Sequence, residues 1–472
     1  MLFNSFTFVW LVVVTFALFY LPILRGLQSY TLIAASLVFY ASNQPVLVFL
    51  LIASITINAV SSYYVLNSTA EKVRKTAAVA GVGLNLAVLF LFKYGPLAAR
   101  TLSLDSADPG SIGHLLVHLP LPVGISFFTF QGISLVVDVF RQRGQNEAVN
   151  IEHRKPGRHF LDTALFKAFF PQLVAGPIVK AHDFYPQIRP KYLRDVNWQG
   201  VFRAVVTGYF LKMVCADNLK DLTFWLTYPY FVHHSTPTLL VLLFGYSMQI
   251  FADFAGYSLI AIGTARLFGY ELMENFNFPY ISQSLSEFWR RWHISLSTWL
   301  KEYLYVPLGG NRRGSFRTYL NLMIVMTLGG LWHGAAWSYA TWGIYHGAGL
   351  AVERYFNLNA PSTNRFSATL RMVGIFTFVT LGWLLFKLPD FSHVIIFLKS
   401  CAANLGRPDD AKIIAYIIFY SLPVVAYHLH YLWKQRSGAK LSPSWQALAY
   451  GTCLFALLLN SGSPGAFIYF QF

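Results

Sequence analysis

The chain has 472 residues, of which 55% are hydrophobic, 17% are aromatic and only 12% are charged. The charged fraction is about half that of an average soluble domain, so the composition excludes an ordinary water-soluble protein. A net charge of +16 would suggest nucleic acid in a soluble chain. Here the basic residues fall in loops between apolar runs, as expected of loops that face the cytoplasm and anionic lipid, and we expect no nucleic-acid partner.

Most of the apolar runs are long enough to cross a membrane, at roughly 20 residues per crossing. They lie near residues 6–24, 30–66, 77–94, 199–215, 238–262, 318–352, 370–388, 411–430 and 445–460. We predict an all-α polytopic membrane protein with about 11 crossings, together with re-entrant or interfacial helices. The first run should remain as a helix, because its start lacks the basic residues of a signal peptide.

The apolar block 30–66 should break into two crossings at Asn43-Gln-Pro45. If the N-terminus lies on the outer side of the membrane, Arg25, Lys72–Lys75 and Arg141–Arg158 then all face the cytoplasm. The positive-inside rule favours this arrangement, so we predict an external N-terminus.

Prolines and glycines interrupt the middle third of the chain at Leu119–Pro122, Phe170–Pro177 and Val306–Gly310. Irregular backbone at membrane depth is tolerated only inside protein or beside a wet cavity. We therefore predict one membrane domain built around a central funnel. It comprises regular spans at about 1–115, a core of broken helices at about 116–352 and further spans at about 366–472, within residues 1–472.

Two polar residues, Gln249 and Asp253, lie four positions apart inside an apolar run and so share one face of a helix. They could hold a histidine or an arginine in place. Alternatively, Asp253 could pair with a basic residue such as Arg266 to stabilise packing. Both interpretations remain open at this point.

The stretch Ser286–Tyr305 predicts an amphipathic helix, because apolar residues recur at spacings of three and four. His293 falls on its polar face with Arg290, and polar groups at membrane depth usually have a function. The alternative is a helix that lies in the membrane interface and takes no part in chemistry.

His333 stands in Gly329-Gly-Leu-Trp-His-Gly334, among small residues that allow backbones or a flat ligand to approach closely. Trp332, Trp337 and Trp342 supply rigid walls around it. An imidazole can take a proton from a hydroxyl nucleophile near neutral pH. A buried histidine can also serve only as a hydrogen-bonding residue, and for His346 we expect a packing role.

Several familiar signatures are missing from the sequence. The three cysteines, Cys215, Cys401 and Cys453, form no C-x-x-C pair, so we expect no disulfide framework and no metal site. There is no G-x-S-x-G elbow, no H-E-x-x-H pair and no G-x-x-x-x-G-K-[ST] loop. ATP hydrolysis and serine-esterase chemistry are therefore disfavoured.

The whole chain resembles the membrane-bound O-acyltransferases, in particular the bacterial branch typified by alginate O-acetylation. The resemblance is carried, in order, by the motifs Met1–Phe6, Pro171–Val179, Asp253–Ser258, Phe288–Trp299, Tyr303–Arg312, Gly329–Ala335 and Phe467–Phe472. One departure is Leu259, where the bacterial branch often carries an acidic residue. A role for that acid is not expected here.

This resemblance implies transfer of an acetyl group from cytoplasmic acetyl-coenzyme A to an exported polysaccharide of the alginate or cellulose type. It implies a catalytic His333, as base or acyl carrier, and a second motif histidine at His293. It further implies a periplasmic acetyltransferase partner and a bacterial inner membrane. The external N-terminus predicted from the charge distribution would then lie in the periplasm. We expect no permanently bound cofactor.

The remaining site residues are expectations from their positions and chemistry. We expect cytoplasmic polar residues to bind the donor's nucleotide and tryptophans to contact its thioester. We expect Gln249 and Asp253 to support the two histidines without contacting the substrate. These residues are Arg290, Arg291, Asn311, Arg312, Arg313, Trp332, Trp337, Gln249 and Asp253. Three other readings stay open: a transporter, a haem protein that uses His333 and His346, and a non-catalytic scaffold of a polymer-secretion complex.

Overall fold

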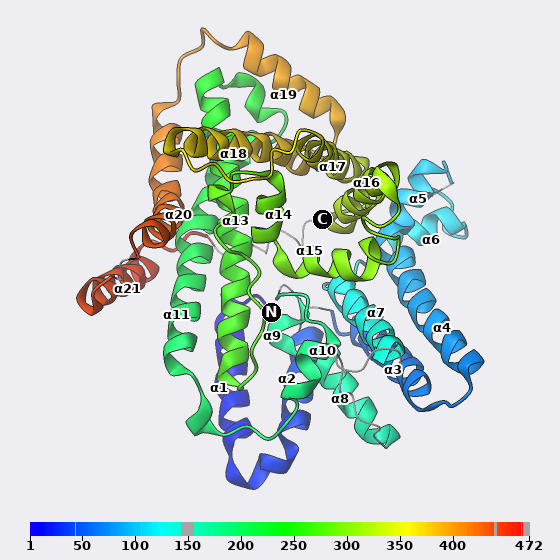
Figure 1. Ribbon diagram of the computed structural model, residues 1–472. Coiled ribbons are helices and arrows are strands. Elements are labelled where there is room, and N and C mark those ends of the chain that lie inside the picture. Colours follow the sequence, from blue (N-terminus) through cyan, green and yellow to red (C-terminus); the bar gives the residue numbers. More distant parts are fainter. Residues whose placement is uncertain are drawn as a thin grey trace. The chain divides into compact units, whose positions relative to one another are not determined.

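A computed structural model describes residues 1–42, 44–104, 106–142, 155–174, 176–438, 441–463 and 465. Within these residues every regular element is a helix, which confirms the all-α prediction (Figure 1). The chain divides into two compact units. Unit 1 comprises Met1–Arg203 and Ile260–Met273, and unit 2 comprises Ala204–Leu259 and Glu274–Phe472. The motif Phe467–Phe472 lies outside the described residues.

Unit 1 contains the first ten helices. They are α1 (Phe6–Tyr20), α2 (Gln28–Ala41), α3 (Leu47–Asn67), α4 (Glu71–Leu89), α5 (Gly95–Thr101), α6 (Ile112–His118), α7 (Ile125–Gln142), α8 (Pro156–Ala168), α9 (Phe170–Leu173) and α10 (Ala181–Phe184). Helices α2 and α3 are separate, which confirms the predicted break near Pro45. The four-residue α9 confirms that the chain is irregular around Pro171.

Polar side chains inside unit 1 satisfy one another across its helices. Helices α3, α4 and α7 pack together, and the amides of Asn58 and Asn85 exchange two hydrogen bonds of 3.1 and 2.9 Å. Amide pairs of this kind link helices where water is absent. Gly132 lies against Asn58, where a Cβ atom would come within 2.5 Å of the amide oxygen.

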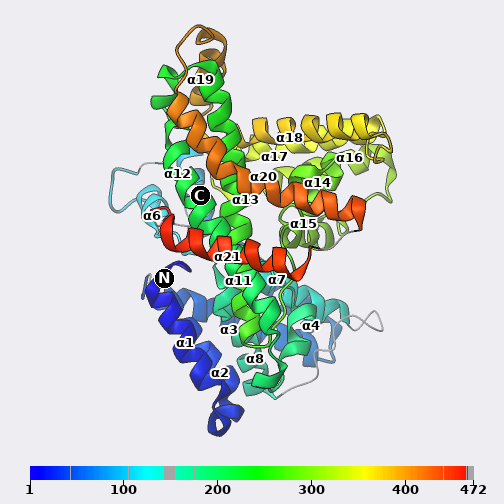
Figure 2. The ribbon, with the colours of Figure 1, turned by 90° about the vertical axis from the view of Figure 1, so that its left-hand side faces the viewer.

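Two helices run from one unit into the other, and nine lie in unit 2. The shared helices are α11 (Trp198–Tyr209) and α13 (Thr236–Leu267). The others are α12 (Asp217–Thr223), α14 (Leu285–Arg291), α15 (Ile294–Leu300), α16 (Gly314–His333), α17 (Trp337–Tyr355), α18 (Arg365–Lys387), α19 (Phe391–Ala403), α20 (Ala411–Ser437) and α21 (Pro443–Leu459). Figure 2 shows α16, α17 and α18 near one another, and α17 contacts both of the others.

Five described helices are long and apolar enough to cross a membrane, and a sixth crossing results if the bent pair is counted. The five are α3, α4 with its continuation to Thr101, α13, α18 and α20; the bent pair is Phe6–Tyr20 with Pro22–Ala41, at an angle of 101°. The expected number of about 11 crossings is not confirmed. The apolar run 318–352 is divided between α16 and α17, so a run read as continuous in sequence is broken in space.

Candidate active site

His333 is the last residue of α16, and the chain then turns back as α17 (Figure 1). The two helices approach so closely that a Cβ atom on Gly330 would lie 2.2 Å from the carbonyl oxygen of Tyr339. A Cβ atom on Gly343 would meet the carbonyl oxygen of Met326 at the same distance. The predicted close approach at the Gly-rich motif is therefore confirmed. It holds the imidazole at a fixed place beside the helix break.

Aromatic rings surround the buried imidazole of His333. Trp332 and Trp342 each lie 5.2 Å from it, measured between ring centroids, and Phe386 lies 5.4 Å away. Trp332 also lies 5.6 Å from the ring of His293. Trp332 and Trp342 thus form the walls that the sequence predicts.

Trp337, the third predicted wall residue, does not share this position. Its side chain is 56% exposed, and no ring contact joins it to a histidine among the described residues. Trp337 begins α17, where the backbone has only just left the break that follows His333. The tryptophan pattern alone does not show which rings point inward.

His293 lies at a second helix break. The predicted continuous helix Ser286–Tyr305 is wrong, because α14 ends at Arg291 and α15 begins at Ile294. Between them His293 adopts a left-handed backbone conformation with φ of 44°. Such a conformation is uncommon for residues other than glycine and often marks functional sites. His293 is therefore not part of a polar helical stripe; it stands at the start of α15.

The break at His293 is held by Asn275, which sequence reasoning missed. The Asn275 carbonyl accepts a hydrogen bond from the N–H of Ile294 (2.9 Å). Its side-chain oxygen accepts from the N–H (3.2 Å) and hydroxyl (2.9 Å) of Ser295. These bonds satisfy N–H groups that the start of a helix leaves without partners. Asn275 thereby acts as the cap of α15.

Glu353, also missed, holds the start of α14. Its carboxylate accepts hydrogen bonds from the N–H groups of Leu285 and Ser286 and from the Ser286 hydroxyl. A carboxylate is favourable at a helix N-terminus because the helix dipole is positive there. Both flanks of the His293 break are thus fixed by side chains from elsewhere in unit 2.

The structure brings His293 and His333 together. Their ring centroids are 6.1 Å apart, although the residues are 40 positions apart in sequence. The His293 side chain is fully buried, and burial disfavours the charged form of an imidazole. His293 is therefore neutral at pH 7, and a neutral imidazole both donates and accepts a hydrogen bond.

The polar residues expected to hold a nucleotide differ in exposure. Arg290, Asn311, Arg312 and Arg313 are exposed to solvent, as a site for a polyanion requires. Arg291 is half-buried, with an ion pair of 2.9 Å to Glu287. Its position is fixed by that contact, so it is the least available of the four arginines.

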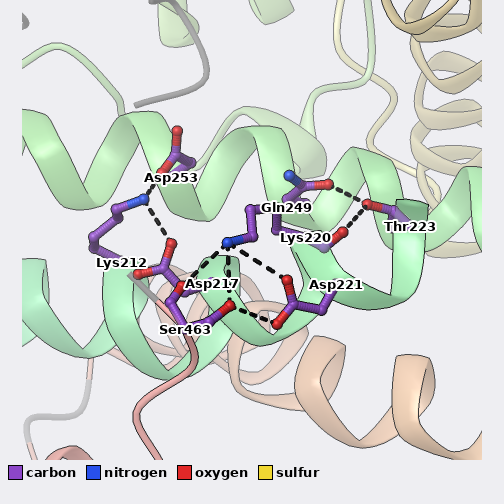
Figure 3. Close-up of polar contacts among 8 residues, drawn as sticks. All are labelled: Lys212, Asp217, Lys220, Asp221, Thr223, Gln249, Asp253 and Ser463. Carbon is purple, nitrogen blue, oxygen red and sulfur yellow. Dashed lines mark hydrogen bonds and ion pairs between the residues drawn. The ribbon is translucent and has the colours of Figure 1, made fainter. Parts of the chain in front are cut away.

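Gln249 and Asp253 have partners that sequence reasoning did not identify. Asp253 forms an ion pair of 2.7 Å with the ammonium group of Lys212, which also pairs with Asp217 at 2.7 Å. Gln249 accepts a hydrogen bond of 2.5 Å from the Thr223 hydroxyl. Figure 3 shows Lys212 between the two carboxylates. These contacts join α13 to α12 and to the π-helical stretch that precedes α12.

The alternative prediction, that Asp253 pairs with a basic residue to stabilise packing, is confirmed, although the partner is Lys212 and not Arg266. Arg266 pairs with Glu271 at 2.8 Å. Lys212 lies in a π-helical stretch, Phe210–Ala216, that Gly256 of α13 approaches closely. A Cβ atom on Gly256 would lie 2.8 Å from the Gly208 carbonyl oxygen, so the absence of a side chain lets the two helices meet.

The segment Asn460–Ser463, named here the C-terminal strap, binds across α12. Gly462 donates a backbone hydrogen bond to Met213 (2.9 Å), and Asn218 donates to the Asn460 carbonyl (3.0 Å). Lys220 donates to the Ser463 carbonyl (3.1 Å), as Figure 3 shows. The strap therefore covers the helix that carries Asp217.

His346 packs inside unit 2. Its ring lies 4.8 Å from Trp342 and 5.2 Å from Trp289, in agreement with the expected packing role. Trp342 also contacts His333, so an indole occupies the space that a haem between His333 and His346 would need. The residues do not fit that cofactor. Within the described residues, no group of three or more His, Cys, Asp or Glu side chains could hold a metal ion.

Comparisons with known proteins show the family to which this sequence is similar. The family model of the membrane-bound O-acyltransferases matches residues 146–388. The chain is 40% identical over 389 residues to "Probable alginate O-acetylase AlgI" of Pseudomonas aeruginosa, covering 79% of this chain and 71% of that protein. It is 34% identical over 400 residues to the peptidoglycan O-acetyltransferase of Helicobacter pylori, covering 79% and 74%. It is 28% identical over 323 residues to the teichoic acid D-alanyltransferase of Bacillus subtilis, covering 65% and 76%.

Proposed function

Since the chain belongs to the membrane-bound O-acyltransferase family, we propose that this multi-pass membrane enzyme transfers an acetyl group to a hydroxyl of an exported polysaccharide, with His333 at the point of reaction. The observation that carries the proposal is the meeting of His293 and His333. Each stands at a helix break, and buried aromatic rings enclose both. Family membership favours acyl transfer over the scaffold and transporter readings.

His333 acts as the general base in this mechanism. Its imidazole takes the proton from the acceptor hydroxyl, whose oxygen attacks the carbonyl carbon of the thioester. The carbon–sulfur bond breaks as the carbon–oxygen bond is completed. The proton passes from the imidazolium to the departing thiolate, so the products are an ester and a thiol. An acyl group carried on His333 is the alternative, in which the same bonds change in two steps.

His293 supports this reaction from the other side of the acetyl group. A neutral imidazole can donate a hydrogen bond to the oxyanion that develops on the carbonyl oxygen. The left-handed backbone at His293, held by Asn275, fixes where that donor stands. Asp253 does not act directly on the histidines in this proposal. It contributes by holding α13 to Lys212.

We propose acetyl-coenzyme A as the donor, bound only during turnover. Its phosphates are held by the exposed Arg290, Arg312 and Arg313, and Asn311 lies in the same loop as the last two. Arg291 has a structural role through Glu287. Trp332 lies against the thioester, and the exposed Trp337 takes no part in its binding.

The acceptor we favour is alginate, because several relatives about 40% identical to this chain are named for alginate O-acetylation. A cellulose-type polymer is the second choice. Transfer to the polymer involves a periplasmic acetyltransferase partner, and the enzyme lies in the bacterial inner membrane with its N-terminus in the periplasm. We further propose a single domain of about 11 crossings around a central funnel, with several crossings made by short or broken helices.

Labelled acetyl-coenzyme A tests the donor and the histidine together. Inside-out membrane vesicles from a deletion strain carrying the wild-type chain should convert the label into base-labile ester. His333→Ala should lower this rate by about 10²- to 10⁴-fold, the usual contribution of a general base. Arg312→Ala should raise the KM for acetyl-coenzyme A with little change in kcat. Trp337→Ala serves as the matched control and should behave as the wild type. Normal turnover by His333→Ala would refute the proposal.

A further inference from the structure

Two of the rings around His333 form one continuous wall. Trp342 stands perpendicular to the imidazole at 5.2 Å between centroids, and Phe386 is tilted by 68° at 5.4 Å. The two rings also touch each other, with centroids 5.5 Å apart. They come from α17 and α18, so the wall is assembled from two helices.

This wall is firmly backed. Trp342 is buried and stacks on Trp383 at 5.6 Å, and its other neighbours are Trp289 at 5.6 Å and His346 at 4.8 Å. Phe386 is buried against Tyr339 at 5.0 Å. Buried side chains at such density do not move aside without cost. A group that reaches the Trp342 ring therefore stops there.

We propose that Trp342, with Phe386 beside it, ends the acyl pocket at His333 and limits the transferred group to the size of acetyl. This inference rests on the proposed function, in which His333 activates the hydroxyl that attacks the thioester. The attacking oxygen and the carbonyl carbon must approach within about 3–3.5 Å of each other. The imidazole holds that oxygen, so the carbonyl carbon also lies close to the wall. A methyl group is the smallest substituent that the acyl carbon can direct toward this wall, whereas a longer chain meets the indole.

The size of the effect follows from pocket discrimination in other enzymes. One additional methylene group in a fitted apolar pocket changes the rate ratio by about 10- to 200-fold. Butyryl has two more methylenes than acetyl, so the wild-type enzyme should prefer acetyl- over butyryl-coenzyme A by at least about 10²-fold in kcat/KM. Replacement of a large buried side chain by alanine leaves a cavity of the order of 150 Å³, which is enough for a guest as large as benzene.

The experiment compares acetyl-, butyryl- and hexanoyl-coenzyme A as labelled donors. Inside-out membrane vesicles from a deletion strain carry the wild-type chain, Trp342→Ala, Trp342→Phe or the control Trp383→Ala. Trp383 is buried one layer further back and stacks on Trp342, so its replacement removes a similar volume. The readout is base-labile acyl ester per amount of membrane protein.

We expect Trp342→Ala to bring the butyryl rate to within about tenfold of the acetyl rate and Trp342→Phe to cause a smaller change. Trp383→Ala loosens the backing of Trp342 but leaves its ring beside His333, so it should also change the preference less than Trp342→Ala does. Trp342→Phe keeps a buried ring and thus tests the inference even if the alanine variant is unstable. Equal use of all three donors by the wild type would overturn the inference. So would an unchanged preference in both Trp342 variants with acetyl transfer intact, or equal broadening by Trp383→Ala. Absence of ester formation from any donor by the wild type would instead refute the proposed function, and the inference with it.

Discussion

Replacing Lys212 by methionine should destabilise the protein strongly, because it removes the cation between two buried carboxylates. The ammonium group lies 2.7 Å from both Asp217 and Asp253, and all three side chains are at most 4% exposed. Breaking a buried pair by removing one partner costs about 3–5 kcal/mol of unfolding free energy. Methionine retains most of the length and apolar surface of the lysine stem, so the missing charge is the main change.

The chain offers a matched control eight positions away. Lys220 contacts Asp221 at 3.4 Å, but their side chains are 30% and 55% exposed. Exposed pairs contribute about 0–1 kcal/mol, so Lys220→Met should change little through this pair. At about 2.1 cal/mol/K of unfolding entropy per residue, the 472 residues correspond to about 1 kcal/mol per degree. Lys212→Met should therefore lower the Tm by about 3–5 °C, and Lys220→Met by no more than about 1 °C.

Thermal unfolding of the detergent-solubilised protein, followed by tryptophan fluorescence, gives both values. Combining Lys212→Met with Asp217→Asn and Asp253→Asn removes the unpaired charges and should recover most of the lost Tm, since buried ion networks are often replaceable by neutral groups. A Tm of Lys212→Met equal to that of Lys220→Met would refute this reasoning. The cluster would then be hydrated rather than buried.

Three further substitutions test the geometry around the histidines and the C-terminal strap. Gly330→Ala should abolish acetyl transfer, because its Cβ atom would lie 2.2 Å from a carbonyl oxygen of α17. The control Gly329→Ala should keep most activity, because its Cβ atom would lie 3.1 Å from the end of a flexible leucine side chain. Asn275→Ala should lower kcat at least tenfold with little change in KM, because α15 loses a cap worth about 1 kcal/mol and His293 loses its fixed position. Gly462→Val should release the C-terminal strap, because even a Cβ atom would lie 2.6 Å from a backbone nitrogen of α12; Gly451→Val, which faces open space, should not. Limited proteolysis near the C-terminus measures that release.

Each of these substitutions has a result that would contradict its basis. Full activity of Gly330→Ala would mean that α16 and α17 separate without harm to the site. A KM effect without a kcat effect in Asn275→Ala would place His293 in substrate binding only. If Gly462→Val and Gly451→Val were cleaved equally fast, the C-terminal strap would not be held by its close approach to α12.

Local signals in the sequence account for the features that were predicted correctly. The break at Asn43–Pro45 and the short α9 around Pro171 follow from proline chemistry, which acts on neighbouring residues only. The approach of α17 to Gly330 follows from the absence of a Cβ atom in the glycine-rich motif. The contact of His333 with Trp332 and Trp342 could be predicted because all three residues lie close together in the sequence, on two helices that pack against each other.

The features that were missed depend on contacts between distant segments. Lys212 and Asp253 are 41 positions apart, and their pairing depends on which face of α13 meets the π-helical stretch. At the break beside His293, Asn275 accepts hydrogen bonds from Ser295, which is 20 positions away, and no local pattern reveals that contact. The apolar periodicity of 286–305 persists through the break, so pattern alone predicted one helix. Trp337 shows the same limit, since its spacing does not reveal its exposure.

Acetate on the exported polymer is the most direct test of whether His333 performs acetyl transfer. The measurement is base-labile acetate on extracellular polysaccharide from a deletion strain that carries the wild-type chain, His333→Ala or the control His428→Ala, at matched membrane levels. His428 is a buried histidine whose ring contacts Phe251 at 4.6 Å, so the control matches the burial of the replaced side chain. We predict acetate with the wild type and with His428→Ala and none with His333→Ala. Equal acetate with His333→Ala would contradict a catalytic role for His333.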